Sequence, residues 1–293
     1  MSSTIEDKEF REFEERSDDI DNIDLESWNV ENEHFAQIQQ RLLSRGTKLL
    51  SGPRGTGKTH QMRIAHLICL KDDTKPLSVF VSFSKYYHLE PFLTKVPDAI
   101  QIFHTWVLCK IVIGCISTVE ELESKYNFFD QNDPYLNKDY IYSFVEKAEK
   151  LNETQLNDDP LIAKLTIPRV SLLLDKLINE FCRNRLVLML DDAALSLTPD
   201  YLVEFFDVVR SLKSNKVSPK ASVYPGTTQY GPRFHVGHDA ELVHCWLNIE
   251  TSTYSLFMNS LIEKRFQRYS DGVNQDIIEI SKASELGYTL YLS

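Results

Sequence analysis

Short apolar runs alternate with segments of helical periodicity along most of the chain. The run RLVLMLDD holds five consecutive apolar residues, which is typical of a strand in a sheet covered on both faces. In KTHQMRIAHLICL, by contrast, Ile64, Leu67 and Ile68 recur at the spacing of one helix face. Strands that alternate with helices predict an α/β fold, with a central, mostly parallel five-stranded sheet and helices on both faces. The expected strands are residues 47–51, 76–84, 185–192, 221–226 and 242–250.

The spacing of these strands indicates how the chain is divided. A long, mainly helical stretch over about 89–183 separates the second strand from the third, and we expect it to contain an inserted group of helices. The other expected helices are residues 33–44, 58–70, 200–212, 253–268 and 273–285. The sequence thus predicts a tail at residues 1–30, a core at 31–250 with a helical insertion at about 89–170, and a partial, short helical lid at 251–293.

Nearly all of the net charge lies in the tail. The chain carries a formal charge of −11, yet residues 1–33 alone hold thirteen acidic side chains against three basic ones. The rest of the chain is therefore close to neutral, which gives no general electrostatic attraction to nucleic acid but leaves a local basic patch open. The tail is interpreted as a solvated, disordered segment, with docking through Phe10, Phe13 and Ile20 as the alternative.

Cysteine usage and the N-terminus favour a cytoplasmic protein. The five cysteines are scattered and form no CxxC pair, as expected in a reducing compartment. The first residues show no basic region followed by an apolar run, so no secretory signal is expected. The most apolar stretch, residues 104–116, is too short to span a bilayer and contains Lys110, so no membrane partner is expected.

The stretch LLSGPRGTGKTH concentrates three of the ten glycines between an expected strand and an expected helix. A bound phosphate chain requires several backbone N–H groups that point inward, and residues without a Cβ permit the turn and the close approach. A lysine at the start of the helix would reach the β and γ phosphates, and the next hydroxyl would hold Mg²⁺. The match to GxxxxGK[ST] comprises Gly52, Pro53, Arg54, Gly55, Thr56, Gly57, Lys58 and Thr59.

Two adjacent acids, Asp191 and Asp192, end the most apolar strand. Ligands of open α/β sheets bind at the carboxyl ends of the strands, so these acids are expected beside the glycine loop. Asp191 would hold Mg²⁺ through water, and Asp192 would polarise the attacking water. A strand that ends in two aspartates is also common without any ligand, and helix capping is the alternative for this pair.

Together the two motifs, a Walker A and a Walker B, resemble those of AAA+ type P-loop ATPases, within them the origin-recognition and initiator branch and the related signal-transducing STAND ATPases. The resemblance covers about residues 32–268 and implies ATP and Mg²⁺ as cofactors. It implies a polar residue that touches the γ-phosphate, at Thr227 or Thr228, and an arginine finger at Arg233. It also implies that a segment near residues 28–30 wraps the adenine.

Three features depart from that family. Asp192 stands where the family usually has Glu, which implies slow hydrolysis. Lys58 and Asp191 are 133 residues apart, which is long for the class and consistent with the insertion. The chain has no arginine after Arg268, so the lid lacks the expected second-sensor arginine.

We therefore expect an ATP-binding, AAA+-like hydrolase that couples ATP·Mg²⁺ binding and slow hydrolysis to a conformational change on a DNA or protein partner. The alternative is a nucleotide-gated switch or scaffold with little turnover, similar to STAND sensors, including those that act in defence against foreign elements. A third reading is an assembly subunit that forms homo-oligomers and supplies Arg233 to a neighbouring copy.

Overall fold

The computed structural model describes residues 20–83, 99–122, 133–150, 156 and 158–267. Contacts divide the chain into two compact units, one formed by residues 1–37 with 246–293 and the other by residues 38–245. The acidic residues 1–19, with Phe10 and Phe13, and the helix expected at 273–285 lie outside the described residues.

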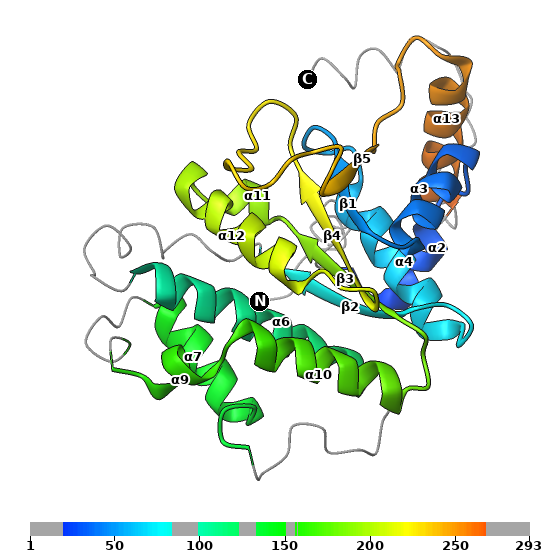
Figure 1. The fold of residues 1–293 in the computed structure, drawn as a ribbon. Helices are drawn as coiled ribbons and strands as arrows, with labels where there is room; N and C mark the ends of the chain where they lie inside the picture. Colours follow the sequence, from blue (N-terminus) through cyan, green and yellow to red (C-terminus); the bar gives the residue numbers. More distant parts are fainter. Residues whose placement is uncertain (1–19, 84–98, 123–132, 151–155, 157, 268–293) are drawn as a thin grey trace, which may run out of the picture. The chain divides into compact units, whose positions relative to one another are not determined.

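The larger unit is built on a five-stranded sheet in which every pairing is parallel (Figure 1). The strand order is β2-β3-β4-β1-β5, so β4 lies between β1 and β3. The α/β class and the five-stranded sheet are thus confirmed. The strands are β1 (Thr47–Ser51), β2 (Leu77–Ser82), β3 (Leu186–Asp191), β4 (Val217–Val223) and β5 (Ala240–His244).

Two strand predictions were wrong in their bounds. β4 begins at Val217, four residues before the expected start, and ends at Val223. A strand that continues through Pro219 is unexpected locally, because proline lacks the N–H that a central strand donates. Pairing with β1 begins only at Lys220, one residue later, so the proline precedes that ladder. β5 ends at His244, and the residues that follow it, up to Glu250, were wrongly assigned to the strand.

Helices cover both faces of the sheet, as the alternation of side chains along β2 shows. Ser78 and Phe80 face α4 (Lys58–Lys71), where His66 bonds Ser78 Oγ at 2.9 Å and its ring lies 6.0 Å from that of Phe80. Val79 and Val81 point the other way, against Gly114 of α6 (Ala99–Glu121). A Cβ at Gly114 would lie 2.7 Å from a β2 carbonyl, so the glycine permits this close packing.

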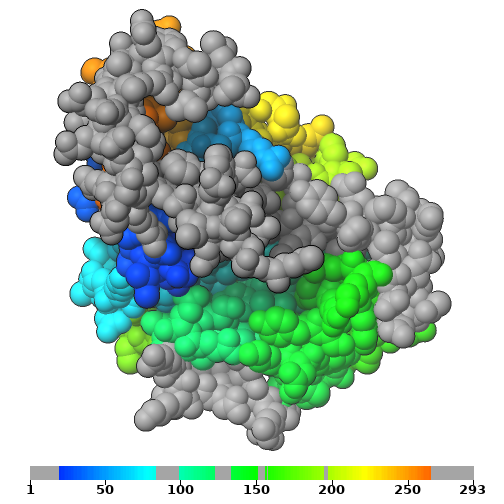
Figure 2. Space-filling model, turned by 180° about the vertical axis from the view of Figure 1, so that it is seen from behind, coloured from blue at the N-terminus to red at the C-terminus, as the bar shows by residue number. Residues whose placement is uncertain are grey.

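The helices on the α6 face form the main hydrophobic core. Phe83 packs against Trp106 of α6 and Phe205 of α12, with ring centroids 5.5 and 5.4 Å apart. In the space-filling view of Figure 2, the surface of the insertion helices, in shades of green, lies next to the cyan surface of the segment between α4 and β2. The remaining helices of this unit are α7 (Lys138–Glu149), α9 (Pro160–Lys164), α10 (Ile167–Glu180), α11 (Ala193–Ser196) and α12 (Pro199–Leu212).

Helix α6 is longer than its most apolar stretch suggested. It spans 23 residues, and in the described part of the chain it is the one helix long and apolar enough, by length and composition, to cross a membrane. The expectation that this segment is too short was therefore wrong. Within the structure, 72% of its apolar window is buried against protein, as in a core helix.

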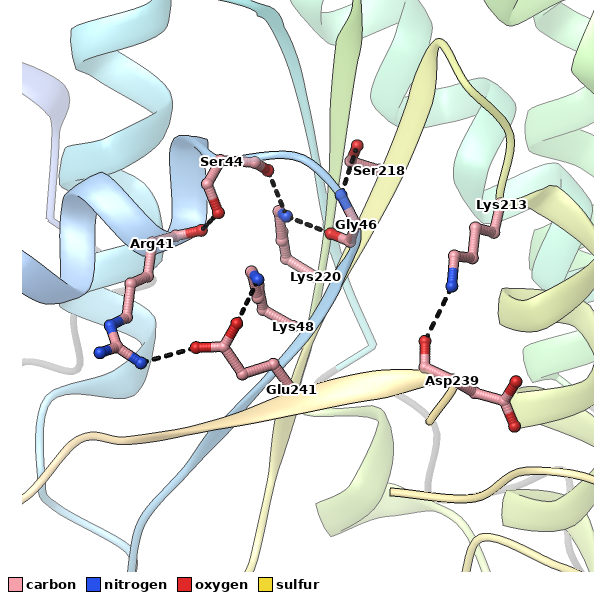
Figure 3. A network of polar contacts seen from close by, with 9 residues as sticks. All are labelled: Arg41, Ser44, Gly46, Lys48, Lys213, Ser218, Lys220, Asp239 and Glu241. Atoms are coloured by element: carbon pink, nitrogen blue, oxygen red, sulfur yellow. Dashed lines mark hydrogen bonds and ion pairs between the residues drawn. The ribbon is translucent and has the colours of Figure 1, made fainter. Parts of the chain in front are cut away.

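A buried polar cluster holds the turn between α3 (Glu33–Leu43) and β1 at the start of the sheet (Figure 3). Lys220, on β4, is fully buried and donates hydrogen bonds to the carbonyl oxygens of Ser44 and Gly46, at 2.7 and 2.5 Å. The N–H of Gly46 donates to Ser218 Oγ at 3.2 Å. Beside Lys220, Lys48 forms an ion pair with Glu241 of β5.

The smaller unit contains α2 (Asn22–Trp28), the first residues of α3 and α13 (Ser252–Gln267). Phe35 and Phe257 meet edge to face with ring centroids 5.0 Å apart. Lys264 donates a hydrogen bond to the carbonyl of Asn29. The segment expected to wrap adenine, near residues 28–30, lies in this unit, whereas the glycine loop lies in the other.

Candidate functional site

The glycine loop connects the carboxyl end of β1 to the start of α4. Gly55 and Gly57 have φ angles of +85° and +81°, in the left-handed region that glycine adopts without strain. A Cβ on Gly52 would lie 2.5 Å from Thr56 Oγ1. Cys245 packs behind the loop, and its Sγ lies 3.6 Å from the carbonyl oxygen of Thr56. Each of the three glycines therefore has a conformational or steric reason to be there.

Lys58 is the first residue of α4, and its side chain turns back over the loop. Its Nζ donates hydrogen bonds to the carbonyl oxygens of Gly52 and Pro53, at 2.7 and 2.9 Å. It also lies 3.9 Å from the centre of the Tyr224 ring, within the range of a cation–π interaction. Burial lowers the pKa of Lys58, and the nearby Cys245 and two acids partly oppose that shift.

The two acids follow directly in the chain but occupy different surroundings. Asp191 ends β3 and is completely buried. Asp192 has a φ of +57°, which is unusual for a residue with a side chain. Its N–H donates to Ser222 Oγ at 2.9 Å, and its Oδ1 accepts from the Tyr224 hydroxyl at 3.1 Å. One bond from β4 and one from the residue that follows β4 thus hold Asp192 in a strained conformation, a feature common at functional sites.

The contacts of Asp192 also bear on the alternative that this residue caps a helix. Asp192 occupies the N-cap position of the short helix α11, but its side chain makes no capping hydrogen bond there. The carboxylate is directed instead to the hydroxyl of Tyr224. Asp192 thus contacts the same tyrosine that lies against Lys58 of the glycine loop.

Tyr224 is the site residue that the sequence did not predict. It follows the last residue of β4 and touches Lys58 on one side and Asp192 on the other. Burial, and then the neighbouring charge of Asp192, raise the pKa of Tyr224, so the hydroxyl keeps its proton and donates. The sequence did contain a signal for Tyr224, a polar side chain at the end of a strand. The signal was missed because β4 was expected to continue to residue 226.

The two threonine candidates belong to a turn after β4. Thr228 Oγ1 accepts from the N–H of Tyr224 at 2.9 Å and lies 3.0 Å from its carbonyl oxygen, so it closes the turn. Thr227 is exposed in this turn. Within the described residues, neither threonine is hydrogen-bonded to the glycine loop or to the acids.

Arg233 lies farther along the same segment. Its guanidinium pairs with Asp207 of α12 at 3.0 Å, and its side chain is 73% exposed. In the described part of the chain no ion pair joins Arg233 to either acid of the site. Its contribution to a neighbouring copy stays a prediction. Of the remaining loop residues, Arg54 is exposed and Thr59, the second residue of α4, is partly buried.

The residues at this edge suit a phosphate chain with a divalent cation. The loop has the glycines that a close approach of phosphate oxygens requires, and Lys58 supplies a cation. Because β4 separates β1 from β3, the loop and the acids are about 10 Å apart by ordinary strand spacing. Tyr224, which follows β4, lies between them and contacts both Lys58 and Asp192.

Comparisons with protein-family models and with curated protein sequences found no match. The assignment of the site therefore depends on its own geometry.

Proposed function

We propose that this chain is a P-loop ATPase of AAA+ type that binds ATP·Mg²⁺ at the loop of residues 52–59 and hydrolyses it slowly. The observation that carries the proposal is the convergence of the glycine loop, Lys58 and two acids at the carboxyl edge of one parallel sheet. In open α/β sheets this edge is where ligands bind. The positive φ angles of Gly55 and Gly57 support a loop shaped around phosphate rather than an ordinary turn.

The residues have distinct roles in this proposal. Loop N–H groups and the N-terminus of α4 hold the phosphates, and Lys58 Nζ moves from the loop carbonyls to the β and γ phosphates. Thr59 and Asp191 would hold Mg²⁺, which would supply positive charge to neutralise the charge that develops in the reaction. Asp192 accepts a hydrogen bond from the attacking water and orients it.

One feature supports slow turnover and keeps a nucleotide-gated switch as the second candidate. Asp192 carries a shorter side chain than the glutamate usual in the family that the motifs resemble, so its carboxylate would hold the attacking water in a different place. The partner on which the conformational change acts, whether DNA or protein, and a homo-oligomer joined through Arg233 are further parts of the proposal.

Direct titration of ATP, with Mg²⁺ and with EDTA, tests the proposal in wild type and in Lys58→Ala. We expect Mg²⁺-dependent binding in wild type and a loss of about 100-fold or more in the variant, because charge-assisted hydrogen bonds contribute about 1.5–3 kcal/mol each. Lys71→Ala is the matched control, since Lys71 is an exposed lysine in the last turn of the same helix. Wild-type affinity in Lys58→Ala would contradict the proposal.

A further inference from the structure

Tyr224 contacts both chemically active groups of the candidate site. Its ring lies below the Lys58 ammonium, 3.9 Å from centroid to Nζ, and its hydroxyl donates to Asp192 at 3.1 Å. Ser222 and Tyr224 are two residues apart, so in an extended chain their side chains point to the same side. Both contact Asp192 and together fix its position. One residue thus bridges the cation and the acid that the reaction would use.

The ring competes with phosphate for Lys58. In the arrangement that the structure shows, Lys58 Nζ has three partners, two loop carbonyls and the Tyr224 ring. Binding of a phosphate at the loop requires the ammonium to leave at least part of this set. Partly desolvated cation–π contacts are strong enough to shift such an equilibrium by about 2-fold to 30-fold.

The hydroxyl acts on Asp192 and not on Lys58. Asp192 has a left-handed backbone conformation, which few residues with side chains adopt without support. The Tyr224 hydroxyl, directly after β4, and the Ser222 hydroxyl, on β4, supply this support. Removal of the hydroxyl leaves the ring under Lys58 in place, so the two contacts can be separated by mutation.

We propose that Tyr224 is a positioning residue with two separable effects: its ring holds Lys58 on the loop and weakens nucleotide binding, and its hydroxyl orients Asp192 for water activation. The inference rests on the proposed ATPase function and extends it. Because Tyr224 contacts both residues, it couples the movement of Lys58 toward a bound nucleotide to the position of Asp192, the acid that activates water.

Two substitutions separate the effects. Tyr224→Leu removes the ring, and we expect it to bind ATP·Mg²⁺ about 2-fold to 30-fold more tightly than wild type, with lower kcat. Tyr224→Phe keeps the ring, and we expect affinity within about 2-fold of wild type with kcat reduced about 10-fold, the cost of one charge-assisted hydrogen bond. Titration calorimetry and steady-state phosphate release measure these quantities.

Tyr230→Phe is the matched control, because it removes the hydroxyl from another partly buried tyrosine, one packed against Phe206 and Phe234. A residue with a merely structural role would weaken binding and turnover together in both Tyr224 variants. As a further readout, Tyr224→Phe should cause no additional loss of kcat in an Asp192→Asn background, since the hydroxyl acts through Asp192.

The outcomes distinguish this inference from the proposed function. Weaker ATP binding by Tyr224→Leu, or wild-type kcat in Tyr224→Phe, would overturn the role of Tyr224 while ATP binding by wild type stands. Additive losses in the double variant would show that the hydroxyl does not act through Asp192. Absence of ATP binding by wild type would overturn the proposed function and this inference with it.

Discussion

Two buried lysines lie at opposite ends of β1 and make nearly the same hydrogen bonds. Lys58 donates to two loop carbonyls after the carboxyl end of the strand, and Lys220 donates to two turn carbonyls before its start. Burial lowers the pKa of both. The hydrogen bonds alone therefore do not distinguish a binding lysine from a structural one.

The surrounding charges do distinguish them. Near Lys58 lie Asp191 and Asp192, which favour its charged form. Lys220 has Lys48 and Arg185 as neighbours, and these cations add to the effect of burial, which together lower its pKa to about 6. Above that pH, Lys220 is a neutral amine with two N–H groups for the two carbonyls that it contacts. The nearby acids favour the charged form of Lys58, the form that binds an anion, whereas Lys220 is suited to hold the turn.

The largest expected difference is in stability. Lys220→Ala leaves two buried carbonyls without their donor and opens a cavity, and we expect a loss of about 2–4 kcal/mol in the free energy of unfolding. Lys58→Ala should lose about 1 kcal/mol or less, because the glycine loop is close to solvent. Urea unfolding of both variants measures this. Equal losses would mean that the two lysines have the same structural role.

The next largest effect is expected on turnover and on Mg²⁺-dependent binding, when the acids near Lys58 are substituted. Asp192→Asn should keep ATP affinity and lose about 100-fold in turnover, because the amide cannot accept a proton from water. Asp191→Asn should instead weaken Mg²⁺-dependent binding about 10-fold or more, since it removes a carboxylate from the metal side. Phosphate release and titration with and without Mg²⁺ separate the two. Normal turnover in Asp192→Asn would move the water-activating role to another residue.

The pH dependence of stability tests the Lys220 side. Burial and the neighbouring cations lower the pKa of Lys220 to about 6 in the folded protein, whereas its ordinary value is 10.5. Between these values the unfolded chain binds more protons, so this lysine makes stability rise with pH. From pH 6.5 to 8.5, wild type should gain about 1 kcal/mol or more relative to Lys220→Met. Parallel curves for the two proteins would contradict a neutral Lys220.

The smallest effect is expected at the rim of the same cluster. Glu241 pairs with Arg41 and Lys48, but its side chain is 45% exposed. Exposed ion pairs contribute about 0–1 kcal/mol, so Glu241→Gln should change the free energy of unfolding by less than about 1 kcal/mol. Its ATP affinity should equal that of wild type. A larger loss in urea unfolding would show that Glu241 is needed to hold the Lys220 turn.

The sequence predicted the parts of the fold in which local signals agree. β1 was placed at 47–51 and α4 at Lys58 because an apolar run, glycines and helical periodicity coincide there. The start of β4 was missed because the effect of Pro219 depends on which neighbour pairs at that position, and this is a tertiary property. Tyr224 was missed for the same reason, since its role follows from β4 lying between β1 and β3. Lys220 has no local signal, because its burial depends on the α3–β1 turn.

An ATP derivative with an acyl group on its terminal phosphate tests the central claim most directly, since such a compound acylates a lysine that lies against the bound phosphates. We predict that mass spectrometry finds the acyl group on Lys58, that excess ATP·Mg²⁺ suppresses this labelling at least about 10-fold, and that Lys220 is unlabelled. Lys220 serves as an internal control because it is also buried but faces the turn at the other end of β1. Labelling of Lys58 that ATP·Mg²⁺ does not suppress, or labelling only of other lysines, would contradict a nucleotide site at this loop.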